Sequence, residues 1–102
     1  MAEVRVIARF VARRGKEEQL GELLAGMLAP THAEQGSKVY ELYESNSNGR
    51  FYLYEIWEGQ AALDQHAASP HFKHLEQTVG ELVEEPFEVN TLKRILTGAA
   101  AA

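Results

Sequence analysis

The stretch KVYELYESNSNGRFYLYEIW, residues 38–57, decides the fold class of this 102-residue chain. Its two arms, residues 38–44 and 50–57, are rich in aromatic and β-branched residues, which favour β-strands. The segment between them, SNSNG at residues 45–49, consists of residues that are typical of turns. The stretch therefore predicts an antiparallel hairpin, and the other elements are placed around it.

The segment before the hairpin predicts a strand followed by a helix. Residues 4–12 are mostly apolar, and Arg14-Gly15 closes the predicted strand. Residues 16–29 place large apolar side chains at helical spacing, so that they form one stripe. These side chains are Leu20, Leu23, Leu24, Met27 and Leu28. We expect Pro30 to end this helix.

The segment after the hairpin predicts two helical pieces and a last strand. Residues 60–67 form the first piece, and Ser69-Pro70 supplies an N-cap followed by proline at the first helical position. A separate helix therefore starts there, with an apolar stripe of Phe72, Leu75, Val79, Leu82 and Val83. After a further proline, residues 87–96 predict the fourth strand, and GAAAA at residues 98–102 predicts a frayed tail.

The predicted order is βαββαβ. It indicates an α+β, ferredoxin-like fold, in which a four-stranded antiparallel sheet carries both helices on one face. No internal repeat or linker divides the chain, so we expect residues 1–97 to form one domain and residues 98–102 its tail.

The third strand is apolar on both faces. One face holds Phe51, Leu53 and Trp57, and the other holds Tyr52, Tyr54 and Ile56. The helices cover one face only, so we expect the other to pack face to face against a second copy, in a homodimer.

Composition argues against several classes of function. The formal net charge of -5 disfavours a nucleic-acid surface, and the absence of cysteine excludes disulfides, thiolate nucleophiles and cysteine-ligated metals. No glycine motif for a dinucleotide or a phosphate is present. Residues 1–10 do not resemble a signal peptide and are too short to span a bilayer, so we expect a cytoplasmic protein without membrane contact.

The stretch HAASPHF, residues 66–72, is the strongest candidate for chemistry. His66 lies on the helix face that should meet the sheet, so its imidazole would face an apolar cavity. A histidine there is either a general base or a packed core residue. His71, in the first turn of the next helix, either takes part in the site or closes that turn. We expect His74 and His32 at the surface.

A metal site is not expected. His71 and His74 could share a ligand face, but a catalytic zinc typically needs a third protein ligand. Glu76 and Glu81 do not clearly converge with this pair. The sequence therefore predicts no metal and no other cofactor.

Glu55 and Trp57 lie on the same face of the third strand. If that face meets the helices, Glu55 could orient His66 and Trp57 could wall a pocket. If it meets a second subunit, both are interface residues. The pattern leaves the two arrangements open.

The chain resembles the antibiotic biosynthesis monooxygenase domain family over about residues 4–96. The resemblance is carried by VIARF at residues 6–10, Gly15-Lys16-Glu17-Glu18, Gly36, KVYELYE, RFYLYEIWE and the pattern His66-x-x-Ser69-x-His71-Phe72. It implies a homodimer with a substrate cavity between sheet and helices in each subunit. It also implies the activity of the family's studied oxygenase members, which oxidise a phenolic or quinol substrate with dioxygen and without flavin, haem or metal.

Other proteins of this fold degrade haem, with an asparagine on the first strand, a tryptophan in the second helix and an axial histidine. Aligned on VIARF and on the histidine pattern, those places hold Ala8, His66 and Glu76 in this chain. The required residues are missing, so we do not expect haem degradation.

The resemblance thus points first to a cofactor-independent monooxygenase of a small aromatic or quinol compound. Its expected base is His66, and its expected substrate-binding residues are Glu55, Trp57, His71 and Phe72. A second hypothesis is an isomerase of a small phosphorylated carbonyl compound, as in autoinducer-processing relatives. Candidates for its phosphate contact are Arg5, Arg9, Arg50 and Lys73. A third is a dimeric ligand-binding module without catalysis.

Overall fold

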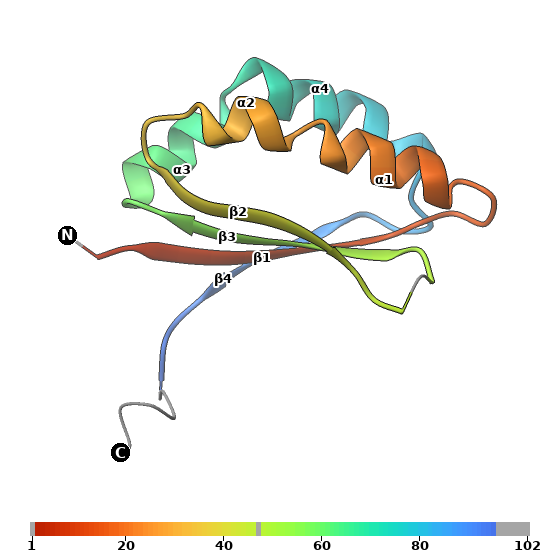
Figure 1. The fold of residues 1–102 in the computed structure, drawn as a ribbon, viewed down its shortest axis with the longest axis horizontal. Coiled ribbons are helices and arrows are strands. Elements are labelled where there is room, and N and C mark those ends of the chain that lie inside the picture. Colours follow the sequence, from red (N-terminus) through yellow and green to blue (C-terminus); the bar gives the residue numbers. More distant parts are fainter. Residues whose placement is uncertain (1, 47, 96–102) are drawn as a thin grey trace.

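The computed structural model describes residues 2–46 and 48–95. Within them the elements follow the predicted order, and both helical segments are divided in two. The elements are β1 Val4–Val11, α1 Glu17–Ala25, α2 Leu28–His32, β2 Ser37–Glu44, β3 Arg50–Trp57, α3 Gln60–Ala67, α4 Pro70–Thr78, the 3₁₀ turn η1 Val79–Glu81 and β4 Glu88–Leu92 (Figure 1).

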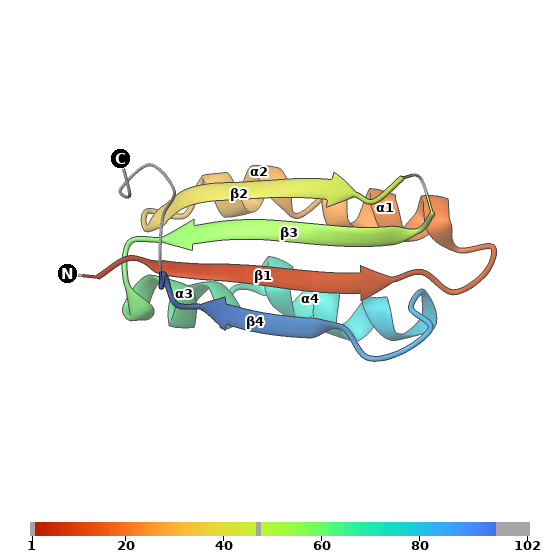
Figure 2. The same ribbon diagram turned by 90° about the horizontal axis from the view of Figure 1, so that it is seen from below.

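The strands form one antiparallel sheet in the order β2-β3-β1-β4 (Figure 2). The central strands pair along their whole length, from Val4 opposite Trp57 to Val11 opposite Arg50. All helices lie on one face of the sheet (Figure 1), with α1 and α2 on the β2 side and α3 and α4 on the β4 side (Figure 2). This is the ferredoxin-like α+β fold that the sequence predicts.

Burial alternates along β1 and β3, as expected for a sheet that is covered on one face. The buried side chains of β3 are Phe51, Leu53, Glu55 and Trp57. They pack with Val6, Ala8 and Phe10 of β1 and with buried helix residues such as Leu20, Leu24 and Leu75. Glu55 and Trp57 therefore face the helices, which decides between the two arrangements that the sequence left open.

The prediction that Pro30 ends the first helix is wrong. α1 already ends at Ala25, and Pro30 lies in the first turn of α2, which starts at Leu28. Proline is tolerated there because the first backbone N–H groups of a helix have no intrahelical acceptor. The break turns the chain so that α2 lies along β2.

The predicted helix start at Ser69-Pro70 is confirmed, because the Ser69 hydroxyl accepts a hydrogen bond from the backbone N–H of Phe72 at 3.2 Å. This helix is shorter than its apolar stripe, and Val83 instead forms an isolated bridge with Ala12. β4 is also shorter than predicted. Residue 96 and the predicted tail at 98–102 lie outside the described residues. No helix in the described part of the chain is both long and apolar enough to cross a membrane.

Candidate active site

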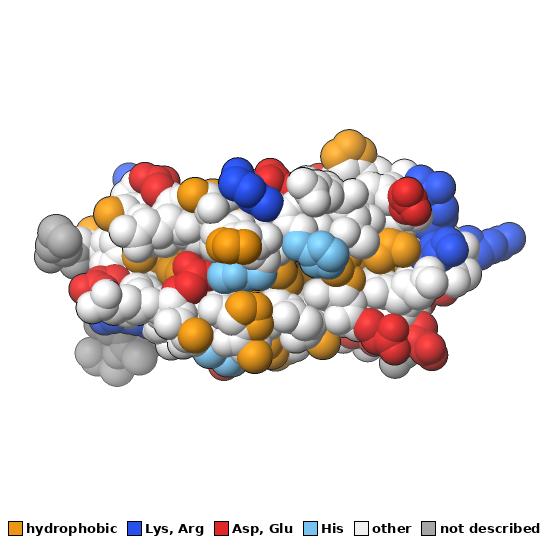
Figure 3. Space-filling model, turned by 90° about the horizontal axis from the view of Figure 1, so that it is seen from above, with side chains coloured by type: hydrophobic (Ala, Val, Ile, Leu, Met, Phe, Trp, Pro, Cys, Tyr) orange, Lys and Arg blue, Asp and Glu red, His pale blue; other side chains and the backbone are white. Residues whose placement is uncertain are grey.

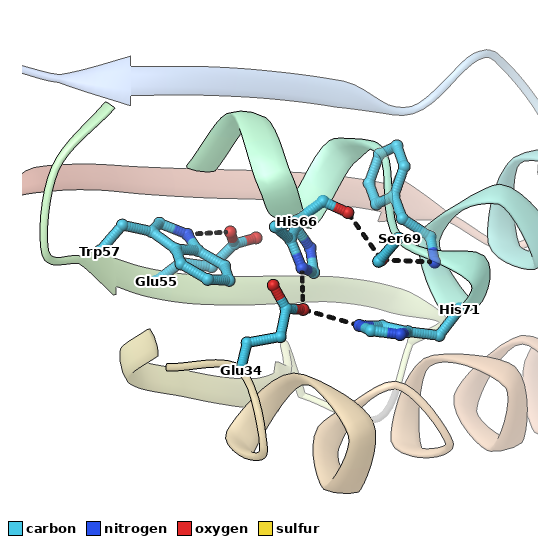
Figure 4. Close-up of polar contacts among 7 residues, drawn as sticks. Glu34, Glu55, Trp57, His66, Ser69 and His71 are labelled. Atoms are coloured by element: carbon cyan, nitrogen blue, oxygen red, sulfur yellow. Dashed lines mark hydrogen bonds and ion pairs between the residues drawn. The ribbon is translucent and has the colours of Figure 1, made fainter. Parts of the chain in front are cut away.

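Two histidines share one carboxylate oxygen on the helix-covered side of the sheet. His66 lies near the end of α3, His71 in the first turn of α4, and Glu34 in the loop after α2. His66 Nδ1 and His71 Nε2 are each 2.7 Å from Glu34 Oε2 (Figure 4). Because a carboxylate oxygen can only accept, both ring nitrogens donate to it.

The three side chains differ in depth. The His66 side chain is 3% exposed, whereas those of Glu34 and His71 are 17% and 19% exposed. Burial lowers the pKa of His66, and the hydrogen bond to Glu34 opposes this effect. A neutral His66 whose Nδ1–H is held by Glu34 has its remaining nitrogen, Nε2, free to accept a proton. The cluster thus reaches from the interior toward the surface, where histidine side chains are visible on the helix side (Figure 3).

Aromatic rings surround the His66 imidazole. Its centroid lies 4.6 Å from that of Trp57, 5.2 Å from that of Phe72 and 5.5 Å from that of Tyr40. These contacts leave the ring little freedom to turn, so its nitrogens keep their directions.

Glu55 is a second carboxyl near His66, and unlike Glu34 it is buried, at 5% exposed. One oxygen accepts a hydrogen bond from the Trp57 indole N–H at 2.9 Å. Burial raises the pKa of Glu55 to about 7; the Trp57 hydrogen bond opposes this, and the charge of Glu34 adds to it. In the view of Figure 4 the Glu55 carboxyl lies between the Trp57 and His66 rings. The carboxyl that is hydrogen-bonded to His66 is nevertheless Glu34, and not Glu55 as the sequence suggested.

A cavity of about 160 Å³ lies between the sheet and α3 and α4. Three polar side chains line it, Tyr40, Glu55 and His66, and the rest of its lining is apolar and includes Phe10 and Phe72. Trp57 and His71 do not line it, but both contact His66, which does, and Trp57 also donates a hydrogen bond to Glu55. No lysine or arginine of the described residues lines it.

The other two histidines lie apart from this cavity. His74 is exposed on α4. His32 is exposed too, and its Nε2 lies 2.9 Å from the backbone oxygen of Tyr40, beside a wider and more open hollow between α2 and β2. Both lie at the surface, as the sequence predicts.

Glu34, His66 and His71 are also the one described group of at least three side chains with ligand atoms close enough for a single metal ion, all within 4.8 Å. This set differs from the His71 and His74 pair that the sequence suggested for testing. Two ligands of a tetrahedral ion lie about 3.3 Å apart when each is about 2.05 Å from the metal. The 2.7 Å separations here are those of charge-assisted hydrogen bonds.

Sequence reasoning missed Glu34, because it lies 32 residues before His66 and 37 before His71. The nearest local signal is Gly36. A Cβ at this position would overlap the methyl group of Ala62 in α3. Glycine therefore lets the loop that carries Glu34 pack tightly against the helix that carries His66.

Comparisons with known proteins agree with this fold. The family profile for antibiotic biosynthesis monooxygenase matches residues 3–78. Rv0793 of Mycobacterium tuberculosis, provisionally named a monooxygenase, is 43% identical over 89 residues, which are 87% of this chain and 88% of Rv0793. The chain belongs to the antibiotic biosynthesis monooxygenase family.

Solved structures show the same similarity. The structure of Rv0793 superposes with a TM-score of 0.88 at 39% identity and covers 95% of this chain and 99% of that one. SO0527 of Shewanella oneidensis superposes with a TM-score of 0.83 at 34% identity, over 88% of each chain.

Proposed function

We propose that this protein is a cofactor-independent monooxygenase that oxidises a small aromatic or quinol compound with dioxygen. One observation carries the proposal: His66 lines an apolar cavity while its Nδ1–H is held by Glu34. This leaves Nε2 as a base in a place where an organic anion is shielded from water.

The reaction needs no reductant besides the substrate. His66 Nε2 takes the hydroxyl proton of a quinol, and the electron-rich ring anion forms a C–O bond with dioxygen. The O–O bond of the resulting hydroperoxide then breaks. One oxygen atom stays on the ring and the other leaves as water, so that quinol and dioxygen give a hydroxyquinone and water.

Glu34 stabilises the imidazolium that forms when His66 accepts the proton. His71 donates to the same carboxylate oxygen, so it holds Glu34 in place beside His66. We therefore assign His71 a positioning role, and Phe72 and Glu55 direct contact with the substrate.

The isomerase hypothesis receives no support from the cavity. A phosphorylated substrate needs a cationic contact, and among the described residues no lysine or arginine lines the cavity. Turnover distinguishes the monooxygenase from a ligand-binding module, which would bind its ligand without converting it.

We also propose that the protein is a homodimer in which the uncovered sheet faces pack together. Tyr52, Tyr54 and Ile56 lie on the uncovered face and are only partly buried. Sedimentation at micromolar concentration should show twice the mass of one 11.4 kDa chain, and a stable monomer would refute the dimer.

Oxygen uptake tests the activity. Protein treated with a chelator should consume one dioxygen per quinol oxidised. Loss of this activity on chelation, with recovery on adding back one metal, would refute the cofactor-independent mechanism and would point to the cluster of Glu34, His66 and His71.

A further inference from the structure

The cluster of Glu34, His66 and His71 offers a divalent metal ion three ligands at one point. The ligand atoms of these side chains all lie within 4.8 Å of one another, and Figure 4 shows the side chains converging from three segments of the chain. Two imidazoles and one carboxylate are the protein ligands of several catalytic zinc sites, in which water takes the fourth position. The donor set therefore fits zinc better than magnesium or calcium, which prefer oxygen ligands.

The separations in the cluster are those of a state in which a proton lies between each nitrogen and the carboxylate. His66 Nδ1 and His71 Nε2 are each 2.7 Å from Glu34 Oε2. Each separation must lengthen by about 0.6 Å to match two ligands of one zinc ion. Glu34 and His71 can make this movement, because both are partly exposed and Glu34 lies in a loop, whereas His66 is held by aromatic rings.

Charge also favours a cation at this point. Among the described residues, Glu34 has salt-bridge contacts with the two histidines only, so no lysine or arginine there competes for its carboxylate. Glu55, whose pKa is raised in part by the charge of Glu34, is a second acidic group nearby. A zinc ion would therefore meet an acidic environment that does not already hold a cationic side chain.

An ion bound to His66 Nδ1 would change the side of the ring that faces the cavity. The ion takes the lone pair of the nitrogen that it binds, so the Nδ1 proton must leave to solvent. Nε2 takes up a proton from solvent, and the ring stays neutral. Nε2 is the nitrogen that the hydrogen bond to Glu34 otherwise leaves free to accept a proton. The ion would thus convert His66 from a base into a hydrogen-bond donor.

We propose that Glu34, His66 and His71 form an inhibitory zinc site, in which one ion replaces two hydrogen bonds and moves the His66 proton from Nδ1 to Nε2. Zinc binding does not depend on the activity of the protein. Only the inhibition rests on the proposed monooxygenase function, in which His66 Nε2 takes the substrate proton.

Calorimetric titration of chelator-treated and dialysed protein with zinc chloride tests the site. We expect one zinc ion per chain, and no binding of magnesium chloride under the same conditions. Glu34→Gln and His71→Ala should each weaken zinc binding by more than about 10- to 100-fold, the usual cost of losing a group that only orients a metal ligand. His74→Ala, at an exposed position of α4, is the matched control and should bind zinc as the wild type does.

Nitrogen NMR of the His66 ring measures the position of its proton. Without zinc the proton should lie on Nδ1, and one equivalent of zinc should move it to Nε2. Circular dichroism confirms that each variant is folded. The proposal is overturned if zinc does not bind, or if folded Glu34→Gln and His71→Ala bind it as tightly as the wild type, which would be adventitious binding to surface histidines. A bound ion that leaves the proton on Nδ1 also overturns it.

Oxygen uptake separates the zinc site from the proposed function. One equivalent of zinc should abolish quinol-dependent oxygen uptake, and a chelator should restore it. If zinc binds the cluster but the zinc-free protein consumes no oxygen with any quinol, the monooxygenase is refuted and the zinc site stands. Oxygen uptake that persists with zinc in the cluster would refute the inhibition and leave the monooxygenase standing.

Discussion

Two regions of this molecule each bring one carboxyl to the neighbourhood of His66, and they use it differently. In the loop after α2, Glu34 is partly exposed and accepts hydrogen bonds from two histidines. On the inner face of β3, Glu55 is almost fully buried and accepts one hydrogen bond from an indole. The same functional group thus accepts from two imidazoles in one region, whereas in the other burial raises its pKa to about 7.

The comparison teaches that the surroundings of a carboxyl decide its role more than its distance from a base. Glu34 accepts from two imidazoles, which suits it to hold the imidazolium of His66. Glu55 has one donor, the Trp57 indole, but burial outweighs it and raises the pKa of Glu55 to about 7.

The largest expected effect comes from removing the imidazole of His66, which lies near both carboxyls. His66→Ala should lower turnover on the order of 10²- to 10⁴-fold, the usual contribution of a general base. His74→Ala, at an exposed position of α4, is the control and should leave oxygen uptake nearly unchanged. If His66→Ala lowers only the melting temperature and leaves turnover intact, His66 is a packed core residue.

The next largest effect is the pH dependence of stability that Glu55 should cause. The folded protein holds the Glu55 proton more tightly than the unfolded chain does, because the pKa rises from 4.5 to about 7. The contribution of Glu55 to the free energy of unfolding should therefore be full below about pH 4.5. It should fall as the pH rises toward 7, by on the order of 3 kcal/mol.

Glu55→Gln cannot ionise and should not show this loss. Urea unfolding of the two proteins at pH 5 and pH 8 measures the difference, with Glu76→Gln, at an exposed position of α4, as the matched control. A stability difference between wild type and Glu55→Gln that does not change with pH would show that burial does not raise the pKa of Glu55.

Gly36→Ala should disturb the Glu34 region and spare the Glu55 region. The added methyl group would overlap Ala62 and push the loop away from α3, at a cost of about 1 to 3 kcal/mol. The pH dependence of stability attributed to Glu55 should remain. Gly80→Ala is the control, since its added methyl group meets no atom within 4 Å. Equal stability of the two variants would contradict the close packing of Gly36 against Ala62.

The smallest expected effect is that of Glu34→Gln, which keeps an acceptor for His66 but removes the charge. Turnover should fall about 10- to 100-fold, as it does when carboxylates that orient metal-bound histidines are replaced. Nitrogen NMR of His66 should show a weakened preference for the proton on Nδ1. If both the turnover rate and the His66 tautomer are unchanged, the charge of Glu34 does not orient His66.

The sequence by itself determined the elements and their order. The hairpin at residues 38–57, the N-cap at Ser69 and the apolar stripes are local patterns, and each depends on side chains within a few residues of one another. The same local logic placed His66 on the sheet-facing side of α3, where it is buried.

Only the tertiary structure decided which carboxyl holds His66 and which face of β3 meets the helices. Glu34 and His66 are 32 residues apart, and they meet because Gly36 lets one loop pack against one helix. Local patterns also failed at Pro30, whose position in the first turn of a new helix depends on the break before it. Alternation along β3 shows that two faces exist, but the packing of α1 to α4 decides which of them is buried.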